Sequence, residues 1–378
     1  MPDEKLTAYR GGKALRRGWT TGSCAAAASQ AAAVLLLTGI APPEIHLHTP
    51  GGITFCLPVE DAHMSGNAAV CTVRKDAGDD PDITNGVRIT ASVRRIEKGV
   101  TIEGGAGVGR ITRPGLAMPV GEAAINPGPR QQIADAVHRA AQQNGYGGGF
   151  SVTISVEDGE ALAAQTYNGH LGIVGGISIL GTSGIVEPMS EKALVDTIRL
   201  ELDSLYAQGQ RIAFLCPGNY GADFARDTLG LDLERAVKCS NFIGEAFDHA
   251  AYRGYPEILL VGHAGKLVKM AAGVMNTHSS VADARQEIFT AHAALCGAPR
   301  ETLEGLMAAI SVDACVELLD EVNLRQPVLS RIGRKMGTRI ALRMKGQARV
   351  EFIMFTGKYG VLAESAGARA LCERLKLQ

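Results

Sequence analysis

The sequence predicts a mixed α/β and α+β protein of two domains: an N-terminal α+β domain over residues 1–148 with an antiparallel sheet, and a C-terminal, Rossmann-like domain over residues 149–378 with a mostly parallel sheet. A chain of 378 residues is long enough for two cores. Strand-like runs follow one another directly over residues 44–75, which favours antiparallel pairing. Beyond the glycine-rich linker candidate GYGGGF at 145–150, strand-like runs alternate with helical patterns, which favours a parallel sheet.

The composition is that of a soluble protein with no preferred polyanionic partner. Lys and Arg (38) almost balance Asp and Glu (39), and 46% of the residues are hydrophobic. A balanced charge argues against nucleic acid as a partner. The eight cysteines form no CxxC pair, and the longest apolar run, Ala31 to Leu37, is too short to span a membrane. We expect a cytoplasmic protein that binds neither nucleic acid nor membrane, and the sequence leaves a homo-oligomer open.

A helix of small residues is expected before Gly39. It follows Arg16 and Arg17 and is capped by a residue such as Thr20 or Thr21. An exposed N-terminus of this helix would offer N–H groups to a carboxylate or phosphate. The alternative is a capped, closely packed core helix.

The strands that follow carry two histidines at metal-ligand spacing. The pattern IHLHTPGGITFCLPV predicts a hairpin in which His46 and His48 share one face. Because a metal site needs three or four converging ligands and no third is evident nearby, we predict no metal site.

The segment KDAGDDPDIT, residues 75–84, crowds four acidic residues into one loop, namely Asp76, Asp79, Asp80 and Asp82. Such crowding costs stability unless it is compensated. A divalent cation, a nearby Arg or backbone amides could each compensate it, and the alternative is a solvated acidic loop.

The next glycine-rich segment, residues 103–130, predicts a long ordered loop. Its glycines do not fit the GxGxxG pattern and no helix begins there, so dinucleotide binding is disfavoured. Arg110, Arg113 and Arg130 suggest instead a rim that meets carboxylates.

A ligand-holding turn is predicted between a glycine-rich strand at 171–180 and a helix that starts after Ser190 and ends at Gly209. Free N–H groups are expected in its polar turn, Gly181 to Gly184, although tight packing alone also explains such glycines. Further strands are expected at 211–216, 257–262 and 350–357, and ligands of parallel sheets lie at the carboxyl ends of strands. ATP chemistry is disfavoured, because the segment GHAGK lacks the spacing of a P-loop.

Several of these segments resemble one family. They are GWTTGSCAAAA at 18–28, KDAGDDPDIT at 75–84, GGAGVGRITRPGLAMPVGEAAINPGPR at 104–130, LGIVGGISILGTSGIVEPMS at 171–190, and KCSNFIGEAFDHA with LLVGHAGKLVKMAAGVMNTHS within 238–279. Together they resemble the cobalt-precorrin-5B C-1 methyltransferases, the CbiD family of anaerobic cobalamin biosynthesis. The chain has Asn85 where a family histidine is expected, so that position is assigned no proton-transfer role.

The resemblance implies transfer of a methyl group from S-adenosylmethionine to C-1 of cobalt-precorrin-5B, which gives cobalt-precorrin-6A. The alternative is a non-catalytic protein that binds tetrapyrrole intermediates of the same pathway. We expect the macrocycle to lie in a cleft between the two domains and to face the N-terminal one, and the cofactor to face the C-terminal domain.

Site residues follow from the motifs together with the resemblance. The expected cofactor residues are Gly175, Gly176, Gly181, Thr182, Ser183, Gly184, Glu187, Gly218 and Asn219, with Glu187 or Asp223 on the ribose. The expected substrate residues are Arg16, Arg17, Thr20, Thr21, Lys75, Asp76, Arg110, Arg113, Arg130 and Lys266. His263, which directly follows a strand, is the expected catalytic residue, and a capping role is its alternative.

Overall fold

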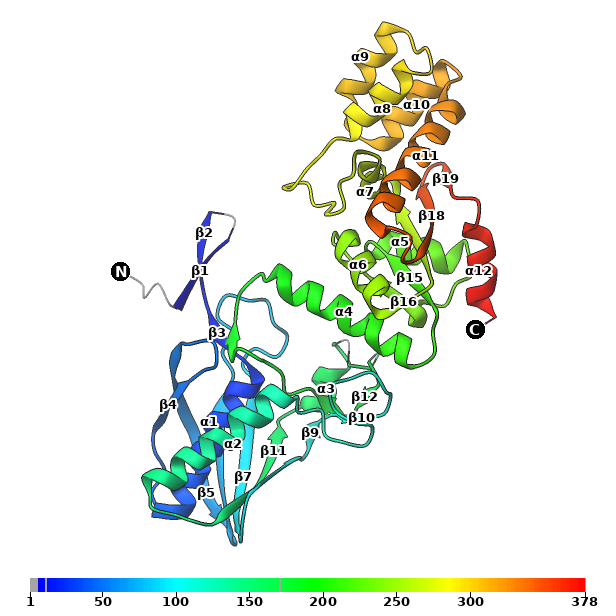
Figure 1. Cartoon of the computed structure of the whole chain (residues 1–378). Coiled ribbons are helices and arrows are strands. Elements are labelled where there is room, and N and C mark those ends of the chain that lie inside the picture. Colours follow the sequence, from blue (N-terminus) through cyan, green and yellow to red (C-terminus); the bar gives the residue numbers. More distant parts are fainter. Residues whose placement is uncertain (1–5, 11, 167, 170, 378) are drawn as a thin grey trace. The chain divides into compact units, whose positions relative to one another are not determined.

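The computed structural model describes residues 6–10, 12–166, 168–169 and 171–377. The chain divides into two compact units, residues 1–191 and 192–378, and each is described by itself (Figure 1). The boundary predicted at 148/149 was wrong, because the strand after the GYGGGF segment pairs within the N-terminal sheet. That segment therefore connects a helix to a strand rather than one domain to the next.

The N-terminal unit is built on a six-stranded sheet with the order β4-β5-β6-β7-β11-β8. All of its neighbouring pairs are antiparallel except β11 and β8, which are parallel. The predicted hairpin with its Pro-Gly-Gly turn is present as β4 and β5. The strands span Glu44–His48 (β4), Thr54–Ser65 (β5), Ala68–Arg74 (β6), Arg88–Ile96 (β7), Val100–Gly104 (β8) and Gly149–Val156 (β11).

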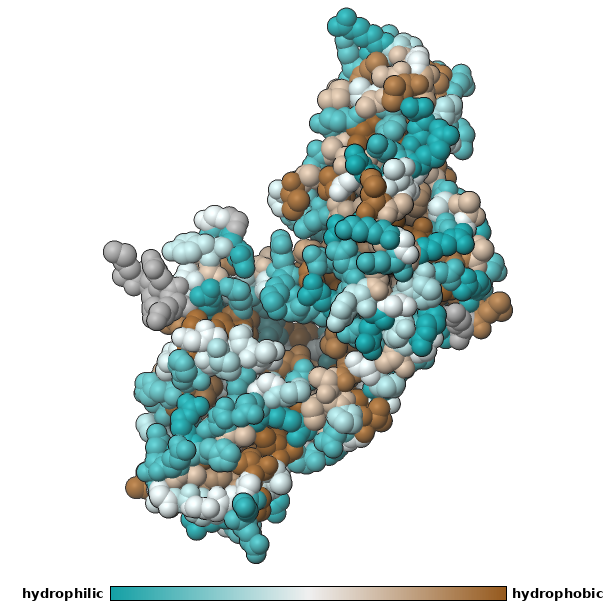
Figure 2. Space-filling model, in the orientation of Figure 1, coloured by the Kyte–Doolittle hydropathy of each residue, from teal (hydrophilic) through white to brown (hydrophobic). Residues whose placement is uncertain are grey.

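Two helices, α1 (Thr21–Thr38) and α2 (Pro127–Gln143), pack together against this sheet. Alanines such as Ala25 and Ala28 are completely buried in α1, so the helix approaches α2 and the strands closely. By length and composition α1 could cross a membrane, but 78% of it is buried inside the unit. It is therefore a core helix. Hydrophilic residues are spread over much of the face of the protein that Figure 2 shows, with hydrophobic residues between them.

The N-terminal unit also contains short strands that pair in twos. The strand predicted at 171–180 is instead two short strands, β12 (Ile173–Val174) and β13 (Gly176–Ile177), which pair with β10 and β9. Positions 167 and 170, which precede this stretch, lie outside the described residues. The others are β1 (Thr7–Arg10), β2 (Lys13–Arg16), β3 (Gly18–Trp19), β9 (Gly107–Val108), β10 (Arg110–Ile111) and β14 (Ile185–Val186), with helix α3 (Gly159–Ala163) between β11 and β12.

The C-terminal unit has a five-stranded sheet of order β16-β15-β17-β18-β19. Its first four strands are parallel and β19 is antiparallel to β18. The strands predicted after residue 210 are present. They span Ile212–Cys216 (β15), Ala236–Lys238 (β16), Glu257–His263 (β17), Arg349–Thr356 (β18) and Gly360–Glu364 (β19).

Helices cover both faces of this sheet, because alternate strand residues point to opposite sides. Leu215 and Leu260 lie in the core that includes α4 and α6, whereas Phe214 and Leu259 lie in the core that includes α5 and α12. These helices span Glu191–Ala207 (α4), Asn219–Asp227 (α5), Ile243–Arg253 (α6) and Ala368–Lys376 (α12). The helices between β17 and β18 span Ala264–Leu267 (α7), Arg285–Ala294 (α8), Arg300–Ala308 (α9), Val312–Glu321 (α10) and Arg325–Met344 (α11).

Candidate functional site

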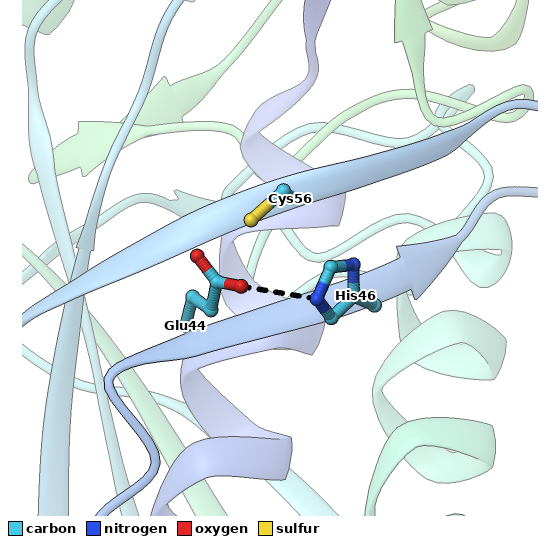
Figure 3. Close-up of side chains that lie close together, drawn as sticks. All are labelled: Glu44, His46 and Cys56. Atoms are coloured by element: carbon cyan, nitrogen blue, oxygen red, sulfur yellow. Dashed lines mark hydrogen bonds and ion pairs between the residues drawn. The ribbon is translucent and has the colours of Figure 1, made fainter.

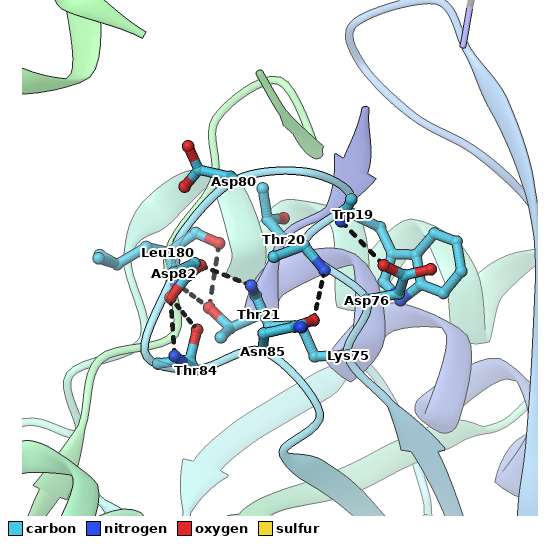
Figure 4. A network of polar contacts seen from close by, with 12 residues as sticks. Trp19, Thr20, Thr21, Lys75, Asp76, Asp80, Asp82, Thr84, Asn85 and Leu180 are labelled. Carbon is cyan, nitrogen blue, oxygen red and sulfur yellow. Dashed lines mark hydrogen bonds and ion pairs between the residues drawn. The ribbon is translucent and has the colours of Figure 1, made fainter. Parts of the chain in front are cut away.

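The N-terminus of α1 is closed by residues of the N-terminal unit itself (Figure 4). Thr20 caps the helix by accepting a hydrogen bond from the Ser23 N–H, and the Gly22 N–H donates to the Leu180 carbonyl. The Thr21 hydroxyl accepts a hydrogen bond from the Leu180 N–H at 2.8 Å. Of the two alternatives that the sequence left open, the structure therefore has the capped, closely packed core helix, because these N–H groups are already bonded inside the protein.

The turn at 181–184 packs tightly against α1. A Cβ atom at Gly181 would lie 2.3 Å from the Thr20 hydroxyl, and one at Gly184 would lie 2.8 Å from the Ser23 hydroxyl. Both glycines also have positive φ angles, 119° and 75°. Packing alone thus requires glycine at these two positions.

The acidic loop is compensated from within the protein (Figure 4). Asp82 accepts a hydrogen bond from Lys75 at 2.6 Å, and Lys75 is only 2% exposed. Burial raises the pKa of Asp82, but Lys75 and Thr84 outweigh it and hold that pKa below its usual value. Asp76 is bound by the guanidinium of Arg16, which lowers the carboxyl pKa. Of the three compensations considered from sequence, arginine and backbone amides are therefore present in the structure.

The two arginines before α1 also pair with carboxylates of the same unit. Arg16 bonds Asp76 through both terminal nitrogens, at 2.6 and 2.9 Å. Arg17 lies 2.9 Å from Glu187, to which Arg10 adds a longer contact of 3.9 Å. The structure thus brings together Arg16, Arg17, Thr20, Thr21, Asp76 and Glu187, as a network around the start of α1. Lys75 belongs to the same region, but its burial removes it from contact with a substrate.

The three arginines of the glycine-rich loop have different environments. Arg130 donates to the carbonyls of Ile102 and Ile125, which is a structural role. Arg110 pairs with Glu103 at 3.1 Å. Arg113, half-buried, has no hydrogen bond or ion pair within the described part of the chain. Of the three, Arg113 is the one with an unengaged cation.

The predicted cofactor residues are divided between the two units. Residues 175–187 belong to the N-terminal unit, because β12, β13 and β14 pair with strands of that unit, whereas Gly218 and Asn219 belong to the C-terminal one. The expectation that the 181–184 turn is part of the C-terminal domain was wrong. The two groups are therefore considered as separate regions.

The predicted residues of the C-terminal unit do gather at one edge of its sheet. The strand order places β15 next to both β16 and β17, and the chain leaves β15 in one direction along the sheet and later returns to β17 on the other side. This is a topological switch point, where open α/β sheets bind ligands outside the carboxyl ends of their strands. Gly218 follows β15, and His263 ends β17.

Gly218 and Lys266 lie close together at this edge. A Cβ atom at Gly218 would be 3.5 Å from the Lys266 Nζ. With φ at 104° and ψ at −180°, Gly218 has a backbone conformation that is essentially restricted to glycine. Gly218 precedes α5, and no side chain caps that helix. The region therefore combines a lysine, a glycine and a helix N-terminus, which together suit a carboxylate or phosphate.

His263 caps the short helix α7. Its Nδ1 accepts a hydrogen bond from the Gly265 N–H at 3.1 Å. Burial lowers the pKa of His263 below its usual value, with a partial opposing effect from Asp313. A neutral imidazole that accepts at Nδ1 carries its proton on Nε2. His263 is thus built to donate a hydrogen bond rather than to take up a proton at that nitrogen.

Sequence reasoning missed several polar groups at this edge. Lys266 donates to the Ser240 carbonyl, and Lys238 donates to the Asn219 side chain at 3.3 Å. Burial raises the pKa of Glu201 to about 7, although Lys238 opposes the shift. Lys238 ends β16 and Ser240 lies two residues beyond it, so the rule that selected the ends of β15 and β17 could also have found them.

The chain matches two family models, described as CbiD over residues 8–188 and as CbiD, C-terminal domain, over residues 276–366. It is 50% identical to the cobalt-precorrin-5B C(1)-methyltransferase of Ruminiclostridium cellulolyticum, over 92% of this chain and 90% of that protein. It is 40% identical to the protein of the same name from Citrobacter koseri, over the whole of both chains.

A solved structure is also similar. The crystal structure of the cobalamin biosynthesis protein CbiD from Archaeoglobus fulgidus is 30% identical, with a TM-score of 0.41, over 75% of this chain and 88% of that one. The family models and the identities to full-length relatives agree with each other. The chain therefore belongs to the CbiD family.

Proposed function

We propose that this chain methylates C-1 of cobalt-precorrin-5B with S-adenosylmethionine as the donor, giving cobalt-precorrin-6A. The observation that carries the proposal is the similarity to relatives named cobalt-precorrin-5B C(1)-methyltransferase, at 50% identity over 92% of the chain. A biosynthetic enzyme of this kind works in the cytoplasm.

The C-terminal unit binds the methyl donor in this proposal, as a Rossmann-like domain does its nucleotide. The donor fits the edge at β15 and β17, because its amino-acid portion carries a carboxylate. Lys266 and the backbone N–H groups at the start of α5 would hold that carboxylate, and Gly218 would leave room for it. Asp223, on the same helix, is the candidate for the ribose hydroxyls, since Glu187 belongs to the other unit.

The N-terminal unit binds the macrocycle, whose acetate and propionate groups require cations. Arg113 has no partner of its own within the described residues, and the Arg16 side chain is about half exposed. A guanidinium has five donors, so Arg16 can keep Asp76 and still meet a second carboxylate. Arg17 is more buried and is held by Glu187, so it supports the loop.

Methyl transfer from a sulfonium needs little from the protein beyond alignment of the two reactants. Bound S-adenosylmethionine supplies an activated methyl group on a sulfonium. The residues around it must hold both reactants in line and exclude water. His263 contributes a hydrogen bond from Nε2–H that orients the substrate, and it stays neutral near pH 7 because burial lowers its pKa.

The test is turnover with purified components. The chain is incubated with cobalt-precorrin-5B and S-adenosylmethionine, and the products are analysed by mass spectrometry. We expect a macrocycle that is heavier by one methyl group and an equal amount of S-adenosylhomocysteine. An unchanged macrocycle that nevertheless binds tightly to the protein would favour a non-catalytic binding protein instead.

A further inference from the structure

The hairpin β4–β5 presents a group of three potential metal ligands on its outer face (Figure 3). His46 lies directly opposite Cys56 in the antiparallel register, and Glu44 lies two residues before His46 on the same face. The residues on either side of His46 in β4, Ile45 and Leu47, are buried in the core with α1. The alternation of the strands therefore places all three polar side chains on the side away from the core.

The three side chains are already close enough to share one ion. His46 Nε2 lies 3.1 Å from Glu44 Oε1, and the ligand atoms of all three residues lie within 4.8 Å of one another. The Cys56 sulfur lies beside the Glu44 carboxylate, within that same distance. The polar atoms thus converge on each other rather than on separate partners.

We propose that Glu44, His46 and Cys56 form a site for Zn²⁺, with water in the fourth position. A thiolate, an imidazole and a carboxylate form a mixed set of ligands that zinc accepts, whereas Mg²⁺ and Ca²⁺ prefer oxygen alone. When zinc binds, a Zn–S bond forms, and the thiol proton is released to solvent. The Cys56 sulfur and the Glu44 carboxylate then both bind the same ion.

The other histidines of the same strands lack such a set. His48 shares the face of His46, but its Nδ1 bonds Thr54 at 3.1 Å. His63, on β5, lies 3.5 Å from Asp61, and this pair is not part of a three-ligand group in the described part of the chain. Sequence reasoning predicted no metal site because it sought the third ligand near His46 and His48 in the chain. Cys56 becomes a neighbour only through the hairpin.

A bound zinc ion would hold the two strands of an edge hairpin together. The turn of this hairpin also contacts the 181–184 region, since the Gly51 N–H donates to the Ser183 carbonyl. Zinc would therefore stabilise the turn on which this region rests. This consequence is independent of the proposed methyl transfer, so the failure of one proposal leaves the other standing.

The test uses the full chain and Zn²⁺ alone. Cys56 is the only exposed residue among the eight cysteines. Six others are buried and Cys296 is intermediate, so Cys56 should be the thiol that is alkylated fastest. We expect one zinc ion to bind per chain by calorimetry, to slow alkylation of Cys56 and to raise Tm. Substitution of Co²⁺ for zinc should give the absorption band of a cobalt–thiolate bond.

Single variants locate the site. Cys56→Ser and His46→Ala should each weaken zinc binding by at least about tenfold, because each removes a ligand. The matched control is His48→Ala, which removes a histidine from the same face of the same strand and should leave the affinity unchanged. Equal zinc affinity in Cys56→Ser and the wild type, or zinc that fails to protect Cys56, would overturn the proposal.

Discussion

Lys75 donates a hydrogen bond to Asp82 at 2.6 Å, and the lysine is almost completely buried between the start of α1 and the loop that it anchors. Asp82 in turn accepts hydrogen bonds from the backbone N–H and the hydroxyl of Thr84. The pair thus holds the acidic loop from its buried side, while Arg16 holds it from its exposed side.

Asp82→Asn should destabilise the N-terminal unit by about 3 kcal/mol. The substitution leaves the buried ammonium of Lys75 without its counter-charge, and removing one partner of a buried pair costs about 3 to 5 kcal/mol. We choose the lower end because a quarter of the Asp82 side chain is exposed. Urea unfolding followed by fluorescence measures the loss, since Trp19 is the only tryptophan of the chain.

The double variant Lys75→Met with Asp82→Leu is the control for this prediction. It removes both charges, so it should recover much of the stability that Asp82→Asn loses. If the double variant is less stable than Asp82→Asn, the ion pair is not the reason for the loss.

Acid should loosen the start of α1 through Asp76 and Asp82. Both carboxyl groups have a lowered pKa in the folded protein, Asp76 through Arg16 and Asp82 through Lys75. Their contribution to stability is therefore complete above the ordinary value of about 3.9 and is lost as the pH falls below it. The fluorescence of Trp19 reports the change, because its backbone N–H donates to the Asp76 backbone carbonyl. In a variant Asp76→Asn, stability should depend less steeply on pH between about pH 4 and pH 2. A dependence identical to that of the wild type would show that Asp76 does not contribute to the loss of stability in acid.

Gly218→Ala should weaken binding of S-adenosylmethionine. Alanine strongly resists a φ of 104° with extended ψ, so the backbone before α5 must shift. Gly230→Ala is the matched control, because Gly230 also has a positive φ in the same unit, at 66°, but follows α5 rather than preceding it. Calorimetry should show a loss of affinity of about tenfold or more for Gly218→Ala alone. Equal affinities of the two variants for S-adenosylmethionine would show that the methyl donor does not bind at this edge.

His263→Ala and His263→Asn separate capping from catalysis. Alanine removes the cap of α7, at a cost of about 1 kcal/mol, whereas asparagine can still accept the Gly265 N–H. If the imidazole orients the substrate, both variants should lower kcat with little change in donor affinity, and only His263→Ala should lower Tm. A His263→Asn variant with normal kcat would show that the residue is only a cap.

The elements of both units were largely readable from the sequence. An alternating pattern located the hairpin β4–β5, and continuous apolar runs located the strands β15, β17 and β18, which are buried on both faces. The domain boundary was not readable in the same way. Strand β11 joins the N-terminal sheet through pairing with β7, and nothing in the local sequence of residues 145–156 indicates that partner.

The candidate site was readable only in part. The rule for carboxyl ends of parallel strands predicted that Gly218, His263 and Lys266 lie at one edge, and the structure has them there because β15 and β17 are neighbours. It was misapplied to Gly181, since that turn follows a short strand of the N-terminal unit. Burial could not be foreseen either, and it is burial that turns Lys75 from a substrate cation into a structural one.

The most direct test of the central claim follows a labelled methyl group to its destination. S-adenosylmethionine with a ¹³C-methyl group is incubated with the chain and cobalt-precorrin-5B, and the product, once freed of cobalt, is examined by nuclear magnetic resonance. The label should appear on C-1 for the wild type and for Gly230→Ala, and much more slowly for Gly218→Ala. Label on another carbon, or no label in the macrocycle at all, would contradict the proposed methyl transfer to C-1.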